Sequence, residues 1–421
     1  MSEISPAAAV TPVDTVDRRA PFMAFTAFMA QNTATGLCYG SFGVLVLEFE
    51  QRTAVGRAQI SIAFSLVVLT TGLLAPIIGS LLGRVSIRAV MVAGALLSAC
   101  GFAGLAHSSS FLAMLGCFGL LIGPGVSLLG NIPAITLVNN WYTRRQGLVL
   151  GLVMMPVAIT LVPLVVVNLL PTLGLERILW LIATGYLVIL PLLLFVSDGP
   201  EDLDSATSGP RADALASATT RKVTPMLYEI IGNPAFLPLI LATGLVVGAG
   251  ISKNTHLVPL IVENHWSLKQ ATLLLAISGG SAMVGSLLHG VLADRFNASR
   301  VLMGNALLQA VVWFILVAPV SYPLLVVDAV LIGICLGGFL TAKAVVVVRI
   351  YGRQRFAAVS GLTSLTTLPF LFGLSPLVGV LREHTGSYRV PISFLIGGLI
   401  IAAICMAFVS RRERHQALAP G

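Results

Sequence analysis

Charged residues are scarce in this 421-residue sequence, at 10% of the chain, with 25 Lys and Arg against 17 Asp and Glu. A soluble domain carries roughly 25% charged residues, so this scarcity excludes the two or three soluble domains that the length alone suggests. Apolar residues make up 57%. They gather in twelve stretches, 22–47, 59–82, 89–106, 111–138, 148–170, 178–197, 235–261, 271–292, 301–319, 323–348, 357–381 and 390–410.

Each apolar stretch approaches or exceeds the roughly 20 residues that a helix needs to cross a bilayer. Only three charged residues fall inside the stretches: Lys253, Asp328 and Lys343. The sequence therefore predicts an all-α polytopic membrane protein with twelve transmembrane helices.

Long polar segments are also few. After the N-terminal tail the longest is 198–234, rich in Ser, Ala, Thr and Asp, which is typical of a flexible linker. The predicted organisation is a tail (1–21), a six-helix half (22–197), the linker (198–234), a second six-helix half (235–410) and a tail (411–421). With no loop longer than 37 residues, the chain lacks the sizeable soluble domain expected of a receptor or sensor.

The net charge of +8 does not indicate nucleic-acid binding, because the basic residues follow the topology. If the N-terminus is cytoplasmic, 17 Lys and Arg lie on the cytoplasmic side of the membrane and 6 on the outer side, which is a positive-inside bias. Residues 1–20 lack the apolar core of a cleavable signal peptide. We expect a multi-pass protein of the cell membrane with both termini cytoplasmic.

Residue patterns for metal binding or catalysis are also missing. The five cysteines lie singly in different apolar stretches and have no metal-ligand spacing, so we interpret them as packing residues. The spans hold no HExxH and no paired carboxylates. We expect no enzyme activity, no cofactor and no metal. The expected partners are the lipid bilayer and a small substrate, and the protein is expected to be a monomer.

The two halves repeat each other in sequence. Gly79-Ser-Leu-Leu-Gly83-Arg84 corresponds to Gly290-Val-Leu-Ala-Asp294-Arg295 at an offset of 211 residues. The loop around Arg144 and Arg145, which leads into Gly151, corresponds to the loop that leads into Gly361 at an offset of 210. An offset of half the chain at two separate loops indicates duplication.

The segment Gly290–Arg300 (GVLADRFNASR) resembles the loop signature of the major facilitator superfamily. The resemblance implies two parallel six-helix repeats about an axis along the membrane normal. It also implies that Gly290, Asp294, Arg295, Arg84, Arg144 and Arg145 belong to loops that hold helix ends together in one gating state. The first copy differs at Gly83, where the family commonly has Asp.

Within that superfamily the chain resembles the monocarboxylate porters and the oxalate–formate antiporter group. The resemblance rests on four motifs, GLCYGSFGV from Gly36, AFSL from Ala63, YTRRQGLVLG from Tyr142 and HLVP from His256. Relatives often carry an Arg deep in helix 8, whereas 271–292 has no charged residue. By the same resemblance helices 1, 4, 7 and 10 line a central cavity.

Lys253 and Lys343 lie within the spans of predicted helices 7 and 10. A charge in the membrane costs at least about 2.5 kcal/mol and is a functional hypothesis by default. Two ammonium groups in the cavity would attract one or two carboxylates. The alternative is that each snorkels or pairs with Asp328, although Asp328 is about 22 Å along the same helix from Lys343 and cannot neutralise it.

Neutral polar residues complete the predicted site. His256 is three residues after Lys253, so the two share a helix face. A histidine there could hydrogen-bond a carboxylate or take up a proton. The alternatives are a gate residue and a packing residue. Gln31, Asn32 and Tyr39 on helix 1 and Asn131 on helix 4 are the other candidates, and interhelical hydrogen bonding is the competing role.

These residues favour a secondary carrier of small organic carboxylates. An exporter of amphipathic compounds, which usually uses a membrane-buried acidic residue, is the less favoured alternative because the deep charges are basic. Mutual repulsion of two lysines would hinder reorientation of the empty carrier, which favours anion exchange over the alternative, proton-coupled symport.

Overall fold

The computed structural model describes residues 18–55, 57–199, 228–317 and 321–418, so most of the predicted N-terminal tail and linker lies outside the described residues. Within these ranges every regular element is a helix. The first half comprises α1 (Ala20–Thr35), η1 (Gly36–Gly40), α2 (Ser41–Thr53), α3 (Arg57–Leu81), α4 (Ile87–His107), α5 (Phe111–Gly116), η2 (Cys117–Ile122), α6 (Gly123–Leu129), α7 (Asn131–Trp141), α8 (Gln146–Val153), α9 (Val157–Val188) and α10 (Leu190–Leu194). The second comprises α14 (Phe236–Glu263), α15 (Leu268–Arg295), α16 (Ala298–Trp313), η3 (Phe314–Val317), α17 (Tyr322–Tyr351), η4 (Arg353–Arg355), α18 (Phe356–Thr385) and α19 (Arg389–Leu418).

Ten helical stretches of the described chain are long and apolar enough to cross a membrane. They differ from the predicted twelve in two places. Gln146–Leu194 counts as one stretch although it covers two predicted spans, which part at Gly174, where φ is 71° and ψ is 168°. The first predicted span, within Ala20–Thr53, is helical but falls outside the ten. The last helix also continues to Leu418, beyond the predicted end at 410.

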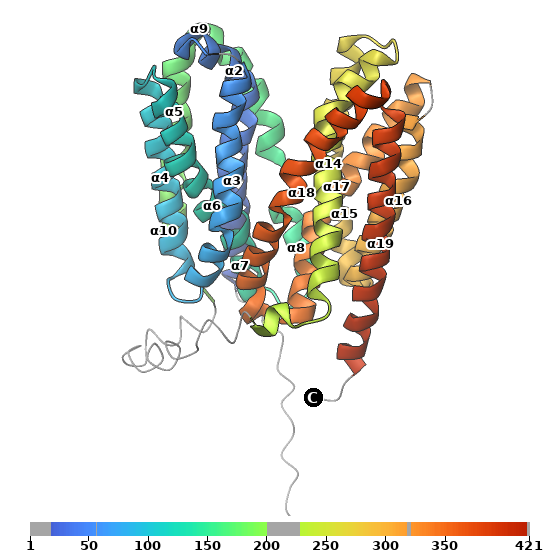
Figure 1. Cartoon of the computed structure of the whole chain (residues 1–421). Helices are drawn as coiled ribbons and strands as arrows, with labels where there is room; N and C mark the ends of the chain where they lie inside the picture. The colour runs from blue at the N-terminus through green and yellow to red at the C-terminus, as the bar shows by residue number, and fades with distance from the viewer. Residues whose placement is uncertain (1–17, 56, 200–227, 318–320, 419–421) are drawn as a thin grey trace, which may run out of the picture.

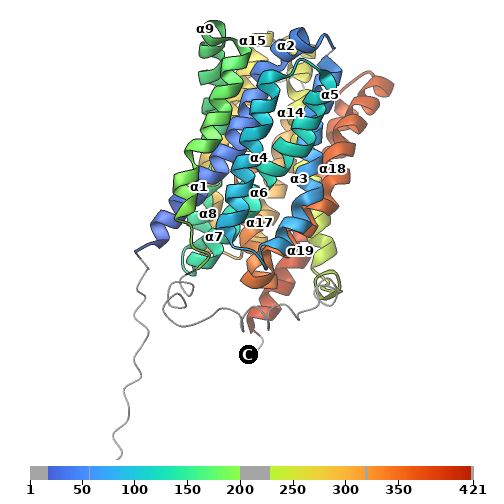
Figure 2. The same ribbon diagram turned by 90° about the vertical axis from the view of Figure 1, so that its left-hand side faces the viewer.

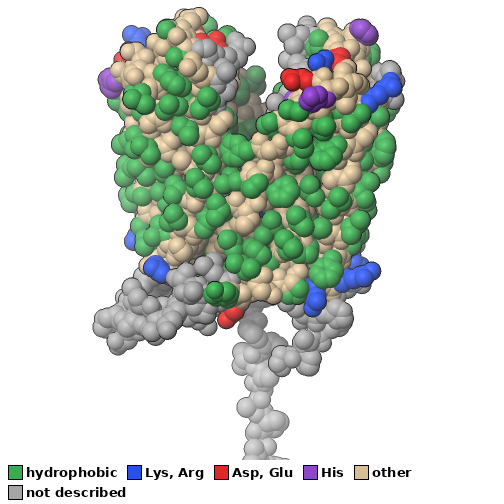
Figure 3. Space-filling model, in the orientation of Figure 1, with side chains coloured by type: hydrophobic (Ala, Val, Ile, Leu, Met, Phe, Trp, Pro, Cys, Tyr) green, Lys and Arg blue, Asp and Glu red, His purple; other side chains and the backbone are tan. Residues whose placement is uncertain are grey.

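The helices form two bundles that diverge toward one face of the molecule (Figures 1 and 2). The first bundle contains α1 to α10 and the second α14 to α19. The start of α1 and the end of α19 lie at the face where the bundles converge, which we name the termini face. The opposite face, which we name the open face, is hollowed between the bundles, and the outer flanks are covered with apolar side chains (Figure 3). A belt of apolar side chains suits contact with lipid.

Small residues close the termini face. A Cβ on Gly290 of α15 would overlap the carbonyl oxygen of Gly147 in α8, and one on Gly79 of α3 would overlap that of Ala357 in α18. Gly79 and Gly290 are the residues related by the repeat offset of 211, so the two contacts are equivalent. Glycine lets the backbones of the two bundles meet, as in other membrane helix pairs.

Two helices of the first bundle are interrupted in mid-span. Gly130, with φ −86° and ψ −132°, separates α6 from α7, and Met154 to Pro156 separate α8 from α9. Pro156 interrupts a helix as expected, since proline lacks the N–H that the helix needs. By contrast, Pro76 and Pro369 lie within continuous helices, α3 and α18.

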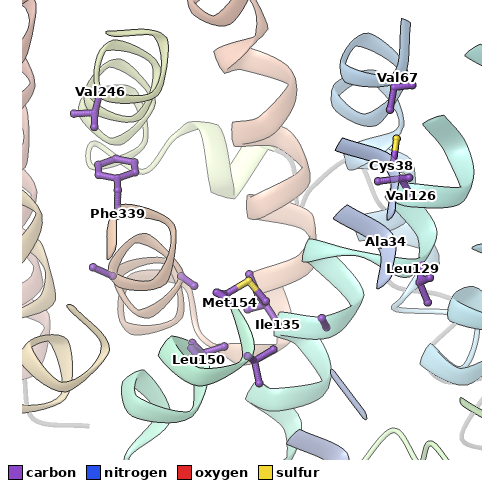
Figure 4. Packing of buried hydrophobic residues seen from close by; sticks show 14 of the residues in the cluster. Ala34, Cys38, Val67, Val126, Leu129, Ile135, Leu150, Met154, Val246 and Phe339 are labelled. Carbon is purple, nitrogen blue, oxygen red and sulfur yellow. The ribbon is translucent and has the colours of Figure 1, made fainter. Parts of the chain in front are cut away.

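One buried apolar cluster joins the two bundles below the cleft. Figure 4 shows its members Val246 of α14 and Phe339 of α17 near Leu150 and Met154, which flank the interruption after α8. The base of the cleft is therefore built from interrupted helices of the first bundle and continuous helices of the second.

Candidate functional site

Lys343 is an unpaired cation in the span of α17. Its side chain is half-buried, and within the described part of the chain it has no ion-pair or hydrogen-bond partner. Phe339, one helical turn earlier, is 2% exposed and packs in the cluster at the base of the cleft. An unpaired ammonium beside an apolar base is suited to binding an anion.

The start of α7 is the part of the first bundle that the repeat relates to Lys343, because Pro133 is the residue 210 positions before it. Asn131 is exposed there, although α7 packs between α1 and α18. The first turn of a helix has N–H groups without intrahelical acceptors, and α7 has no side-chain cap. Pro133 has no N–H and the Ala134 N–H donates to the Gly130 carbonyl oxygen, so the donors at this helix start are the N–H groups of Asn131 and Ile132.

Gln31 of α1 lies beside this helix start. Its Oε1 is 3.5 Å from the position that a Cβ of Gly130 would take. The side chain is 8% exposed, and Oε1 has no hydrogen-bond partner among the described residues. Gln31, Asn131 and Lys343 are therefore three predicted site residues with a polar group that has no hydrogen-bond partner among the described residues.

Asn32, the neighbour of Gln31, has both atoms of its side-chain amide group engaged in hydrogen bonds within the protein. Its Nδ2 donates to the carbonyl oxygens of Phe28 and Met155, both at 3.1 Å, and its Oδ1 accepts from the N–H of Ala158 at 2.9 Å. One amide thus satisfies both sides of the interruption between α8 and α9. The alternative of interhelical hydrogen bonding describes Asn32 in this structure.

Tyr39 lies in the π-helical turn η1. Its ring is half-buried and meets Phe64 of α3 edge-on, with the ring centroids 5.5 Å apart. It therefore contributes an aromatic surface to the first bundle.

Lys253 is paired, in contrast to Lys343. Its Nζ lies 2.6 Å from Oδ2 of Asp328 in α17 and 5.6 Å from the ring centroid of Trp313 in α16. The Lys253 and Asp328 side chains are 3% and 2% exposed. The ammonium is directed into the second bundle, so the expectation of two free lysines in the cavity is corrected: burial makes a carboxylate partner necessary, and Asp328 supplies it.

His256 does not share a site with Lys253. Its Nδ1 lies 3.3 Å from the Tyr388 hydroxyl and its Nε2 lies 3.0 Å from the carbonyl oxygen of Ser375. These contacts link α14 to α18 and to the start of α19 near the open face. The arrangement fits the packing or gate alternative for this histidine.

The loop motif forms a clamp between the bundles. The carboxylate of Asp294 at the end of α15 accepts from the backbone N–H groups of Gly147 and Leu148 at 2.7 and 2.8 Å. A carboxylate at a helix N-terminus is stabilised by the orphan N–H groups and the helix dipole. In the other copy Gly83 replaces the aspartate, so this clamp is one-sided.

The basic residues of the two loop motifs, Arg84, Arg144, Arg145 and Arg295, are all exposed. Arg145 adopts a left-handed conformation with φ 55° at the start of α8.

One buried polar row was not predicted from the sequence. Asn305, Gln309 and Trp313 follow one another at every fourth residue of α16, and all three side chains are at most 2% exposed. The Gln309 Nε2 donates to Asn305 Oδ1 at 2.7 Å. Their spacing on one helix face was a signal that periodicity could have revealed.

The comparisons with known proteins agree with this architecture. Monocarboxylate transporter 10 of Danio rerio is 27% identical over 81% of this chain and 68% of its own length. Monocarboxylate transporter 11 of Homo sapiens is 28% identical over 87% of this chain and 78% of its own length. The solved structure of the E. coli fucose:proton symporter FucP superposes with a TM-score of 0.66 at 16% identity, covering 95% of this chain and 99% of that one.

A family model adds the decisive match. The model described as Major Facilitator Superfamily matches residues 20–263 and 250–421. Together these cover both bundles, the clamp and both in-span lysines. The chain is a membrane transporter that belongs to the major facilitator superfamily.

Proposed function

We propose that the protein is a secondary carrier of small organic monocarboxylates that works by alternating access. The observation that carries this proposal is the unpaired Lys343 in the span of α17. The names of relatives such as monocarboxylate transporters 10 and 11 support the same substrate class.

The charge balance favours a single carboxylate over two. Lys253 and Asp328 neutralise each other, which leaves Lys343 as the uncompensated in-span charge of the described residues. A monoanion would neutralise it, whereas a dianion would bring a second desolvated charge without a partner. This narrows the range of mono- and dicarboxylates that two free lysines would have allowed.

The first bundle would orient the rest of the substrate. The N–H groups at the start of α7 and the amides of Gln31 and Asn131 offer neutral hydrogen bonds, and Tyr39 offers a ring surface. Binding from both sides of the cleft would draw the two bundles together, which is what an alternating-access cycle requires.

An unpaired lysine also favours exchange. Closing the cleft around a bare ammonium costs at least about 2.5 kcal/mol, and a bound anion removes that cost. The empty carrier would therefore reorient slowly and the loaded carrier quickly. Proton-coupled movement is the second candidate, with the proton on the substrate or on His256.

The first experiment measures uptake of a panel of mono- and dicarboxylates and an organic cation into proteoliposomes. We expect saturable uptake of monocarboxylates, no uptake of the cation, loss of uptake in Lys343→Gln and partial retention in Lys343→Arg. Both variants should keep the thermal unfolding midpoint of the unmodified protein. Unchanged uptake in Lys343→Gln would refute the proposal.

The second experiment decides the coupling. Efflux from preloaded vesicles is measured with and without external monocarboxylate. Strong trans-stimulation that survives collapse of the pH gradient supports exchange. Flux that follows the pH gradient and ignores external anion would establish proton coupling instead, and His256→Gln would then be the variant to test.

A further inference from the structure

Three buried polar atoms of the second bundle have no hydrogen-bond partner among the described residues: Gln309 Oε1, Trp313 Nε1 and Asp328 Oδ1. Buried polar atoms in native proteins are almost always paired with protein or with ordered water. Their side chains are at most 2% exposed. Three orphaned atoms in one region require an explanation.

The contacts around them place the three groups together. Gln309 and Trp313 are one turn apart on the same face of α16. The Trp313 ring centroid is 5.6 Å from Lys253 Nζ, and that nitrogen is 2.6 Å from the other oxygen of the Asp328 carboxylate. Trp313 therefore lies next to the ion pair, and Gln309 is its neighbour on α16.

The hydrogen-bonding capacity of the three atoms matches one molecule. The indole Nε1 can only donate, whereas the amide and carboxylate oxygens accept. A water molecule donates two hydrogen bonds and accepts up to two, so it can serve one donor and two acceptors at once. Trp313 would donate to the water oxygen, and the two water hydrogens would go to Gln309 and Asp328.

The other contacts of the row fix which way each amide faces. Gln309 Nε2 donates to Asn305 Oδ1, and Asn305 Nδ2 lies 2.9 Å from His289 Nε2 and donates to the Cys335 carbonyl oxygen at 2.8 Å. His289 Nδ1 lies 3.0 Å from the Gly285 carbonyl oxygen. Since Gln309 directs its NH₂ group toward Asn305, its oxygen is the amide atom left to accept a hydrogen bond, as a water-binding site requires.

We propose that the second bundle contains a binding site for an ordered internal water molecule, formed by Gln309, Trp313 and Asp328. The water completes one hydrogen-bonded network that joins the Lys253–Asp328 pair to His289 through α16. It supplies the Asp328 carboxylate with its missing donor and so keeps this oxygen satisfied beside Lys253. Helices α14 to α17 would then be held together by polar contacts as one unit.

The direct test is a structure of the full chain in lipid nanodiscs at a resolution that shows ordered water. We expect density for one water within hydrogen-bond distance of all three atoms, lost in Trp313→Phe and in Gln309→Met. A direct hydrogen bond from Trp313 Nε1 to Gln309 or Asp328 with no density between them would overturn the proposal.

Thermal unfolding provides a second readout. Trp313→Phe and Gln309→Met should each lower the unfolding midpoint. The midpoint of the double variant should not fall below that of the less stable single variant, because either change already removes the water. Trp180→Phe, at an exposed tryptophan of α9, is the control and should leave the midpoint unchanged. Additive losses in the double variant would contradict a shared water.

Discussion

The two bundles share a fold, but equivalent helices in them pack against their neighbours in different ways. Gly94 and Phe102 of α4 are the residues 211 positions before Asn305 and Trp313 of α16. A Cβ on Gly94 would lie 2.6 Å from the backbone nitrogen of Leu129, so α4 and α6 meet backbone to backbone. At the equivalent place α16 uses a row of amide side chains. Close packing and buried hydrogen bonding are alternative ways to join helices in a membrane.

This difference separates two tasks. The second bundle holds the buried ion pair, the polar row and Lys343, all on continuous helices. The first bundle holds the helix interruptions at Gly130 and at Met154 to Pro156. Charge within the span is thus carried by one bundle and helix interruptions by the other, and substitutions can test each feature separately.

The largest expected effect is on stability of the second bundle. Lys253→Met leaves Asp328 as a buried charge without its partner, which costs about 3–5 kcal/mol. The double variant Lys253→Met/Asp328→Leu should recover most of that loss, because it converts the pair to apolar packing. Thermal unfolding in detergent measures both. A double variant no more stable than the single one would show that the pair does not carry this energy.

The next effect concerns the interruption in the first bundle. Asn32→Leu removes the acceptor of Ala158 N–H and a donor to the Met155 carbonyl, at a cost of about 1–3 kcal/mol per buried group left unpaired. We expect a lower unfolding midpoint. Asn168→Leu is the matched control, because Asn168 is exposed on α9 and bonds only within its own helix. Equal losses in the two variants would exclude a special role for Asn32.

A smaller effect is expected at the clamp. Asp294→Ala removes both hydrogen bonds to the start of α8, worth about 0.5–2 kcal/mol by analogy with other helix caps. The population should shift away from the state that is closed at the termini face. Distances between spin labels on the two bundles at the open face report this shift. Label distances that stay the same in Asp294→Ala would mean that the clamp does not set the equilibrium.

The smallest effect tests why the clamp is one-sided. Gly83→Asp should add a carboxylate near the start of α18 and stabilise the same closed state by about 0.3–1 kcal/mol. The Cβ fits, because its nearest contact would be the Ser80 carbonyl oxygen at 3.5 Å. The spin-label distances should move opposite to those of Asp294→Ala, while Gly83→Ala should have no effect. A shift in Gly83→Ala of equal size would attribute the change to the backbone.

Part of the candidate site could be predicted because a charged residue within an apolar membrane span is visible in the sequence. Lys343 stands out as a charge in an apolar span, and Asp328 is too far along the same helix to reach it, so its isolation follows from helix geometry. The clamp was likewise expected from the loop motif, although its acceptor role toward Gly147 and Leu148 was not. The interruption at Gly130 had no comparable signal beyond glycine and proline three residues apart.

The membrane class, the repeat and the short list of polar in-span residues follow from residue types and their spacing, because burial of charge is costly wherever it occurs. Which of those residues remain unpaired depends on the packing of the helices. Lys253 and Asp328 are 75 residues apart in the chain, and Asn32 is 126 residues from Ala158, yet each pair is in hydrogen-bond contact. Helical periodicity gives the face of one helix but not the partner that it meets. Whether a buried lysine binds substrate or an aspartate is therefore decided by how the helices pack.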